Sequence, residues 1–105
     1  MVYTLVFRIR KIYFDQIMAG TKTREVRASK RFWYIRALKA NHDLLEGKEV
    51  RAVFLCGKLR HTRRLERVRC FETAKEALGR EPSEQGKKDI GEGPVYGFDL
   101  GRVME

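Results

Sequence analysis

The sequence of 105 residues is poor in cysteine and histidine, with two of each. Cys56 and Cys70 do not form a CxxC pair, so the sequence does not indicate a disulfide scaffold. A structural zinc site needs several ligands at characteristic spacing, whereas these cysteines and histidines are scattered along the chain. We therefore expect neither a metal site nor a cofactor.

Long hydrophobic runs are also missing. No stretch approaches the ~18 consecutive apolar residues of a membrane-spanning helix. The first residues, Met1 to Arg10, alternate between apolar and polar side chains instead of forming the apolar core of a signal peptide. We expect a soluble, cytoplasmic protein that has no membrane partner.

Several catalytic signatures are absent as well. The sequence contains no GxSxG elbow, no Walker loop and no HExxH motif, so it gives no support to a serine hydrolase, a P-loop nucleotide hydrolase or a metalloprotease. The histidines are not paired along the chain. A ribonuclease that uses two imidazoles in concert is therefore expected only if Lys22 replaces one of them.

The composition is that of a folded domain with a strong positive charge. Hydrophobic residues make up 43% of the chain and charged residues 35%, which suits one hydrophobic core, and the length suits a single domain over residues 1–105. The net charge is +9. The excess lies in residues 1–71, which hold 18 basic and 6 acidic side chains. This excess of positive charge favours a polyanionic partner. The alternative is that the charge only keeps the protein soluble.

Hydrophobic periodicity predicts five strands and a few short helices. We expect strands at residues 3–9, 24–27, 50–56, 59–71 and 95–103, and helices at residues 12–19 and 74–78. Gly20 ends the first helix, and Thr73 with Glu76 forms a capping box at the start of the second. Gly57 and Lys58 predict a tight hairpin, and the long strand after it is expected to contain a bulge.

Two segments have a weaker pattern. Residues 28–45 suit a short amphipathic helix and a returning loop, with a strand as the alternative. Residues 80–94 are rich in glycine, proline and charge, which predicts a mobile surface loop. Five strands with two or three short helices predict an α+β fold, a small mixed β-barrel, because closure protects sheet edges at this size. An α+β sandwich is the alternative.

The segment from Phe14 to Arg27 resembles the signature of the ASCH domain family, whose members are related to the PUA-like RNA-binding barrels. In that signature, a helix ending in I-x-x-G-x-K-T is followed by a strand that carries E-x-R. The matching residues here are Ile17, Gly20, Lys22, Thr23, Glu25 and Arg27. The resemblance implies a PUA-like barrel of about five strands, with a cleft beside the signature and a role in RNA or nucleotide metabolism.

The family includes RNA-binding modules, coactivator-associated domains, ribonucleases and small amidohydrolases that act on N4-acylcytidine. In the amidohydrolases, a lysine at the position of Lys22 works with a threonine at the position of Glu25 and with a glutamate further along the chain. Here Glu25 replaces that threonine, which removes the expected nucleophile. The neighbouring Thr23 is then the candidate nucleophile.

We expect Lys22, Glu25 and Arg27 to form the binding site in this cleft for a base or nucleotide. Glu25 can accept a hydrogen bond from the exocyclic amine of a base, and Lys22 or Arg27 can meet an anionic group. Lys22 and Glu25 can also act as an acid/base pair. The alternative is an ion pair that only joins a strand to a loop.

A second set of residues suggests a surface for a phosphate backbone. Trp33 lies among basic residues and is a candidate for stacking on an unpaired base, with a core position as the alternative. The candidate nucleic-acid contacts are Lys30, Arg31, Arg36, Arg60, Arg63, Arg64 and Arg67. A solvated basic face without a ligand is the other interpretation.

Three functions are consistent with these residues, and whether the protein is an enzyme stays open. The first is an RNA-binding or nucleotide-binding module. The second is a small hydrolase, either an N4-acylcytidine amidohydrolase or a ribonuclease, with Lys22 as general base. The third is an interaction domain whose basic face meets an acidic protein.

Overall fold

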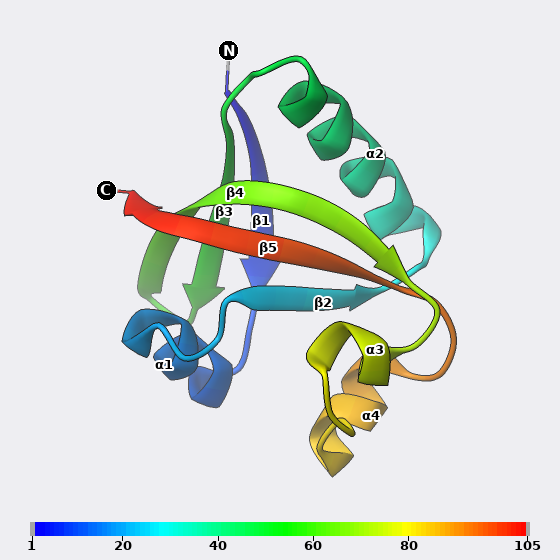
Figure 1. Ribbon diagram of the computed structural model, residues 1–105. Helices are drawn as coiled ribbons and strands as arrows, with labels where there is room; N and C mark the ends of the chain where they lie inside the picture. The colour runs from blue at the N-terminus through cyan, green and yellow to red at the C-terminus, as the bar shows by residue number, and fades with distance from the viewer. Residues whose placement is uncertain (1, 105) are drawn as a thin grey trace.

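The computed structural model describes residues 2–104 and contains one five-stranded sheet of order β1-β3-β4-β5-β2 (Figure 1). The strands are β1 (Tyr3–Arg8), β2 (Arg24–Ala28), β3 (Val50–Cys56), β4 (Leu59–Phe71) and β5 (Val95–Met104). β1 runs parallel to β3, and all other neighbours are antiparallel. The α+β class with a mixed sheet is therefore confirmed.

The sheet curls into a half-barrel, because β4 and β5 are long and bent (Figure 1). The register between β4 and β5 shifts on both sides of Leu65, which confirms the predicted bulge. The predicted hairpin is also present, with a left-handed φ of 58° at Gly57. β1 and β2 lie at the two edges of the sheet and do not pair with each other within the described residues.

Over residues 2–104 the sheet is accompanied by four helices, whereas the sequence predicts two or three. They are α1 (Lys11–Ala19), α2 (Arg31–Leu45), α3 (Ala74–Leu78) and α4 (Glu84–Ile90). α1 and α3 lie where the sequence predicts them. At the start of α3, the Glu76 amide donates to the Thr73 hydroxyl at 3.2 Å, as the capping box requires. None of these helices is long and apolar enough to cross a membrane.

The prediction of a short helix and a loop over residues 28–45 is wrong, because α2 extends over 15 residues. The segment contains no glycine or proline that would end a helix. Trp33, Ala37, Ala40 and Leu44 recur at helical spacing and pack against the core. Tertiary packing of this face thus stabilises a helix that the mixed composition of the segment obscures.

The prediction of a mobile loop is wrong for the part of residues 80–94 that forms α4. The Ser83 hydroxyl accepts a hydrogen bond from the Gly86 amide at 3.0 Å and caps the helix. At its other end, Ile90 packs against a small cluster that includes Val26 and Ala77. The apolar anchor of α4 is thus supplied by distant parts of the chain, which local composition does not reveal.

The main core joins the sheet to α1 and α2. Phe7, Phe54 and Phe98 are fully buried at its centre. Trp33 of α2 stacks on Phe7, with ring centroids 4.9 Å apart. This stack fixes the start of α2 beside the edge strand β1, and the same place forms one wall of the cleft described next.

Candidate functional site

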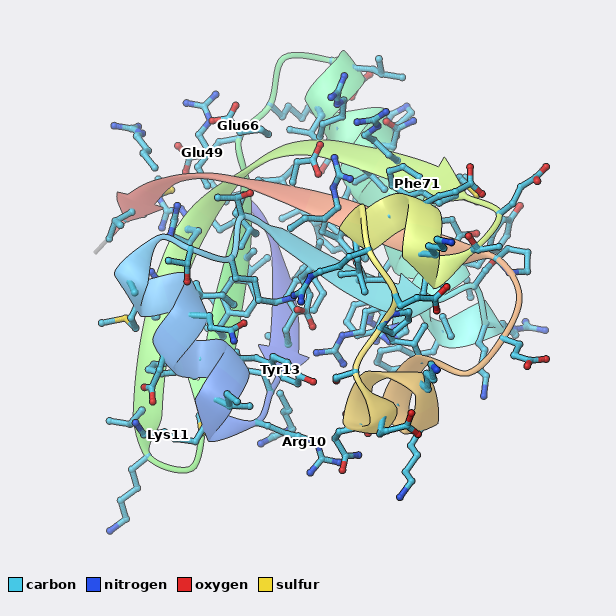
Figure 2. All side chains as sticks on the ribbon, turned by 60° about the horizontal axis from the view of Figure 1, so that its bottom comes forward. Arg10, Lys11, Tyr13, Glu49, Glu66 and Phe71 are labelled. Carbon is cyan, nitrogen blue, oxygen red and sulfur yellow. The ribbon has the colours of Figure 1, made fainter. Side chains whose placement is uncertain are left out.

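A cleft of about 1290 Å³ opens along the edge strand β2. Its walls come from the end of β1, the start of α1, the start of α2 and the segment that carries α3 and α4. The cleft therefore occupies the region where a closed barrel would join β2 to β1. Figure 2 shows Tyr13 and Arg10 on the α1 side of this region, with α4 opposite.

The end of α1 positions Lys22 in the cleft. Gly20 ends the helix in the left-handed conformation, with φ of 79°. The turn lets the amides of Thr21 and Lys22 both donate to the carbonyl of Gln16, at 3.0 and 3.1 Å. A side chain at Gly20 would strain this turn, so the signature glycine has a local structural reason.

Glu25 is the centre of the site. The residue is only 6% exposed, and its carboxylate lies between two cations. The Lys22 Nζ lies 3.4 Å from Oε1, and the Arg27 Nη2 lies 2.7 Å from Oε2. The structure thus brings together the three residues that the sequence predicts to share a cleft. A buried carboxylate of this kind needs such partners, because desolvation disfavours an isolated charge.

Arg27 connects the two edges of the half-barrel. Its Nε donates to Glu25 Oε2 at 2.8 Å, and its Nη2 donates to the backbone carbonyl of Arg8 at the end of β1, at 3.1 Å. The guanidinium carbon lies 5.2 Å from the ring centroid of Phe7 and 5.1 Å from that of Trp33. Arg27 is therefore a positioning residue, held by aromatic rings and by β1, that orients Glu25.

Trp33 lines the cleft but is also part of the core. The indole is partly buried, with one stack on Phe7 and an edge contact to Phe98 at 5.8 Å. The indole thus packs against the core, as the alternative interpretation expects, and also borders the cleft. Tyr13 lies on the α1 wall, where its ring centroid is 5.5 Å from the Lys22 Nζ.

The cleft also contains Thr23 and two acidic residues that the sequence analysis does not single out. Thr23 is exposed, and its backbone carbonyl accepts from the Leu100 amide at 2.8 Å. The Asp99 carboxylate accepts a hydrogen bond from the Arg24 Nε at 2.5 Å. Glu66 lies across Gly101 of β5, where a Cβ would come within 2.0 Å of its Oε1. The sequence gives no local indication that Glu66 lies in the cleft, because its approach to Gly101 depends on the pairing of β4 with β5.

Two of the predicted nucleic-acid contacts bind to other parts of the chain. The Arg63 Nε donates to the Gly101 carbonyl at 2.6 Å, and its Nη1 donates to the Ile17 carbonyl at 3.2 Å. Arg63 thus ties the end of α1 to β5. Arg67 is exposed and reaches the Asp99 carboxylate at 3.4 Å.

The other predicted contacts lie on two separate surfaces. Arg60 is exposed and Arg64 is half-buried on β4. Lys30 and Arg31 are exposed at the start of α2, where they border a small hollow of about 370 Å³. Arg36 lies over the Phe32 ring at 3.5 Å and donates to the Phe32 carbonyl. Lys30 is the member of this set that also lines the main cleft beside Glu25.

An ion pair joins the two walls of the cleft. Arg10, just before α1, donates to both carboxylate oxygens of Asp89 on α4, each at 3.0 Å. This hydrogen-bonded pair raises the pKa of Arg10 and lowers the pKa of Asp89, because each charge stabilises the other. The two residues are 79 positions apart in the sequence, so no local pattern predicts the contact.

One cluster has the residue types of a metal site. His42, Asp43 and Glu46 bring their ligand atoms within 4.8 Å of one another at the end of α2. Lys39 lies 3.0 Å from Asp43, and Lys48 lies 3.0 Å from Glu46. Hydrogen bonds from these lysines lower the pKa of both carboxyl groups. The carboxylates are thus already neutralised by lysines, and a metal ion would have to displace these lysines.

Comparisons with known proteins give one similar architecture. No family model matches the sequence, and no curated protein matches it either. Among solved structures, the crystal structure of a Ser-to-Ala mutant of ZmASCH from Zymomonas mobilis aligns with a TM-score of 0.64. The alignment covers 97% of this chain and 73% of that chain, at 19% sequence identity.

The chain has an ASCH-like fold. The resemblance that the sequence shows between Phe14 and Arg27 is therefore confirmed at the level of the fold. Within this ASCH-like fold, the signature residues lie together, since the turn after α1 and the edge strand β2 carry all the polar members.

Proposed function

We propose that the protein binds RNA or a nucleotide and receives one base or nucleotide in the cleft that contains Lys22, Glu25 and Arg27. The observation that carries this proposal is a buried carboxylate that faces an open cleft with a cation on each side. The resemblance to the ASCH family supports the same class of ligand.

The carboxylate of Glu25 can bind the polar edge of a base. The contact between Oε1 and the Lys22 Nζ, at 3.4 Å, is long for a hydrogen bond, so Oε1 keeps lone pairs that can accept an exocyclic amine. Tyr13 and Trp33 supply flat side chains in the walls, which suit the face of a base.

The rim of the cleft can bind phosphate. Arg8 and Lys30 both line the cleft, and neither forms an ion pair with an acidic side chain in residues 2–104. Arg10 and Arg24, by contrast, are neutralised by Asp89 and Asp99. Arg8 and Lys30 are also exposed, so they can meet a phosphate group of a nucleotide bound in the cleft.

The test is a titration of fluorescently labelled single-stranded RNA, followed by anisotropy at several salt concentrations. The variant Arg8→Glu/Lys30→Glu is expected to weaken binding at least about tenfold and to flatten the salt dependence. The matched control Lys58→Glu/Arg102→Glu has the same charge change on exposed residues outside the cleft. Equal loss in both variants, or no binding at low salt, would overturn the proposal.

Glu25→Gln separates recognition of the base from attraction to phosphate. The amide keeps the shape of the side chain but removes an acceptor oxygen and the negative charge. We expect weaker binding, by about tenfold, with the salt slope of the unmodified protein. Unchanged affinity would show that the cleft does not read a base through Glu25.

A second candidate function is hydrolysis of a modified nucleoside or of RNA. It is favoured by the presence of Lys22, Thr23 and Glu66 along one cleft, which offers a general base, a hydroxyl nucleophile and a second carboxylate. Turnover of N4-acetylcytidine or of labelled RNA, lost in Lys22→Ala while RNA affinity persists, would support this function. A protein that binds RNA and turns over neither substrate would be a binding module.

A further inference from the structure

The outward face of α2 exposes several large apolar side chains to solvent. Ile35, Leu38 and Leu45 are 50%, 53% and 79% exposed, and Tyr34 beside them is about half exposed. The opposite face of the helix already packs on the core through residues such as Trp33. A surface helix normally carries polar side chains on its outer face, so this surface is unusual for a free protein.

The exposed residues have the spacing of a helix-packing seam. Arg31, Ile35, Leu38, His42 and Leu45 follow one another at intervals of four, three, four and three residues along α2. This alternation places side chains on one line of a helix and is the pattern by which a second helix packs alongside. Ile35, Leu38 and Leu45 are aliphatic, and aliphatic side chains suit a packed helix better than they suit bases, which stack on flat rings.

The charges around the seam define the chemistry of the partner. Lys30 and Arg31 are exposed at its start and form no ion pair with an acidic side chain in residues 2–104, whereas Lys39 is already paired with the buried Asp43. α2 contains no acidic residue before Asp43. The whole chain carries +9, so a second copy would bring the same cations to the same face and be repelled. The complementary partner is acidic.

We propose that the outward face of α2 binds an acidic amphipathic helix of another protein. The apolar side chains of that helix pack on Ile35, Leu38 and Leu45, and its carboxylates lie beside the flanking cations. Ile35, Leu38 and Leu45 do not line the cleft, whereas Lys30 does, so variants of the three aliphatic residues test this interface without changing a residue of the nucleotide proposal.

The experiment uses a labelled synthetic helix of about three heptads with leucine at the seam positions and glutamate at the flanking positions. A second peptide has lysine in place of every glutamate. We expect the glutamate peptide to bind with micromolar affinity, and Ile35→Ala/Leu38→Ala to weaken it at least about tenfold, because truncation removes buried apolar area without changing charge. The matched control Val6→Ala/Val103→Ala truncates two similarly exposed residues on the sheet and should leave the affinity unchanged.

Several outcomes would overturn the proposal. Equal binding of both peptides, or equal affinity of the two alanine variants, would remove the acidic helix as the occupant. A dimer in sedimentation that Ile35→Ala/Leu38→Ala dissociates would assign the seam to a second copy. If the protein binds phosphatidylserine vesicles and Ile35→Ala/Leu38→Ala abolishes this binding, the seam would be assigned to a membrane. If circular dichroism shows that the double variant is unfolded, Leu45→Ala, at the most exposed position, is expected to weaken the glutamate peptide about threefold, and unchanged affinity would count against the proposal.

Discussion

Arg27 donates a hydrogen bond from its Nη2 to the backbone carbonyl of Arg8, at 3.1 Å, and so connects the two unpaired edges of the sheet. The same guanidinium holds the carboxylate of Glu25. One side chain therefore bridges the two edges at a single point and also holds the buried acid of the cleft. A change at Arg27 is therefore expected to affect both the stability of the fold and the binding that we propose for the cleft.

Replacement of Arg27 by alanine should destabilise the fold. Glu25 would keep Lys22 as its partner and lose the stronger contact, so we expect a loss of about 2 kcal/mol in the free energy of unfolding. Urea denaturation measures this change. In the Glu25→Gln background, which has no buried charge to compensate, the loss of stability caused by Arg27→Ala should be smaller by ~1 kcal/mol. Strictly additive losses would contradict the coupling between the two residues.

The contact between Arg10 and Asp89 should make the docking of α4 sensitive to acid. The folded pKa of Asp89 is lower than its ordinary value of 3.8, so the ion pair stabilises α4 above that pH and is lost as the pH falls through the lower folded value. The pKa of Arg10 is raised, so Arg10 stays charged throughout. Because both groups are exposed, the effect is local and should weaken with salt.

NMR spectra of the α4 amides, recorded from pH 6 downward at low salt, test the acid sensitivity. We expect the signals of residues 84–90 to shift together in the unmodified protein. Asp89→Asn should remove most of this shift, because the variant has no ion pair with Arg10 to lose. Signals that titrate identically in both proteins would show that another group controls α4.

Replacement of Gly20 by alanine should disturb both the fold and the cleft. The left-handed φ of 79° disfavours a side chain by about 1 kcal/mol, which thermal unfolding can measure. Gly47→Ala is the matched control, because Gly47 has a φ of 77° and lies outside the cleft. Both variants should lose similar stability, whereas only Gly20→Ala should weaken RNA binding, because it moves the turn that carries Lys22.

Two glycines of β5 should respond differently to a methyl group. At Gly97 a Cβ would lie 2.8 Å from Phe71 Cε2 and 2.9 Å from Arg24 Cδ, so Gly97→Ala should cost about 1–3 kcal/mol by overpacking. At Gly101 the obstacle is the side chain of Glu66, which is exposed and can rotate away. Gly101→Ala should therefore change stability by less than about 1 kcal/mol. A larger loss than in Gly97→Ala would show that Glu66 is held in place.

Much of the local structure follows from the sequence because it depends on neighbouring residues. Alternating apolar side chains specify the strands, Gly20 ends α1 in a conformation that other residues disfavour, and Thr73 caps α3. The signature after α1 also places Lys22, Glu25 and Arg27 within a few residues of one another, so their meeting required little tertiary information.

Only the tertiary structure determined which charges are free and which hold the fold together. Arg63 is an unremarkable member of a basic strand in the sequence, yet it binds the carbonyls of Ile17 and Gly101. The docking of α4 through Arg10, and the apolar outer face of α2, likewise depend on which surfaces pack against distant elements. The physical reason is the same in each case: periodicity and turn propensity act over a few residues, whereas burial and ion pairing are set by partners that the chain brings together only when it is folded.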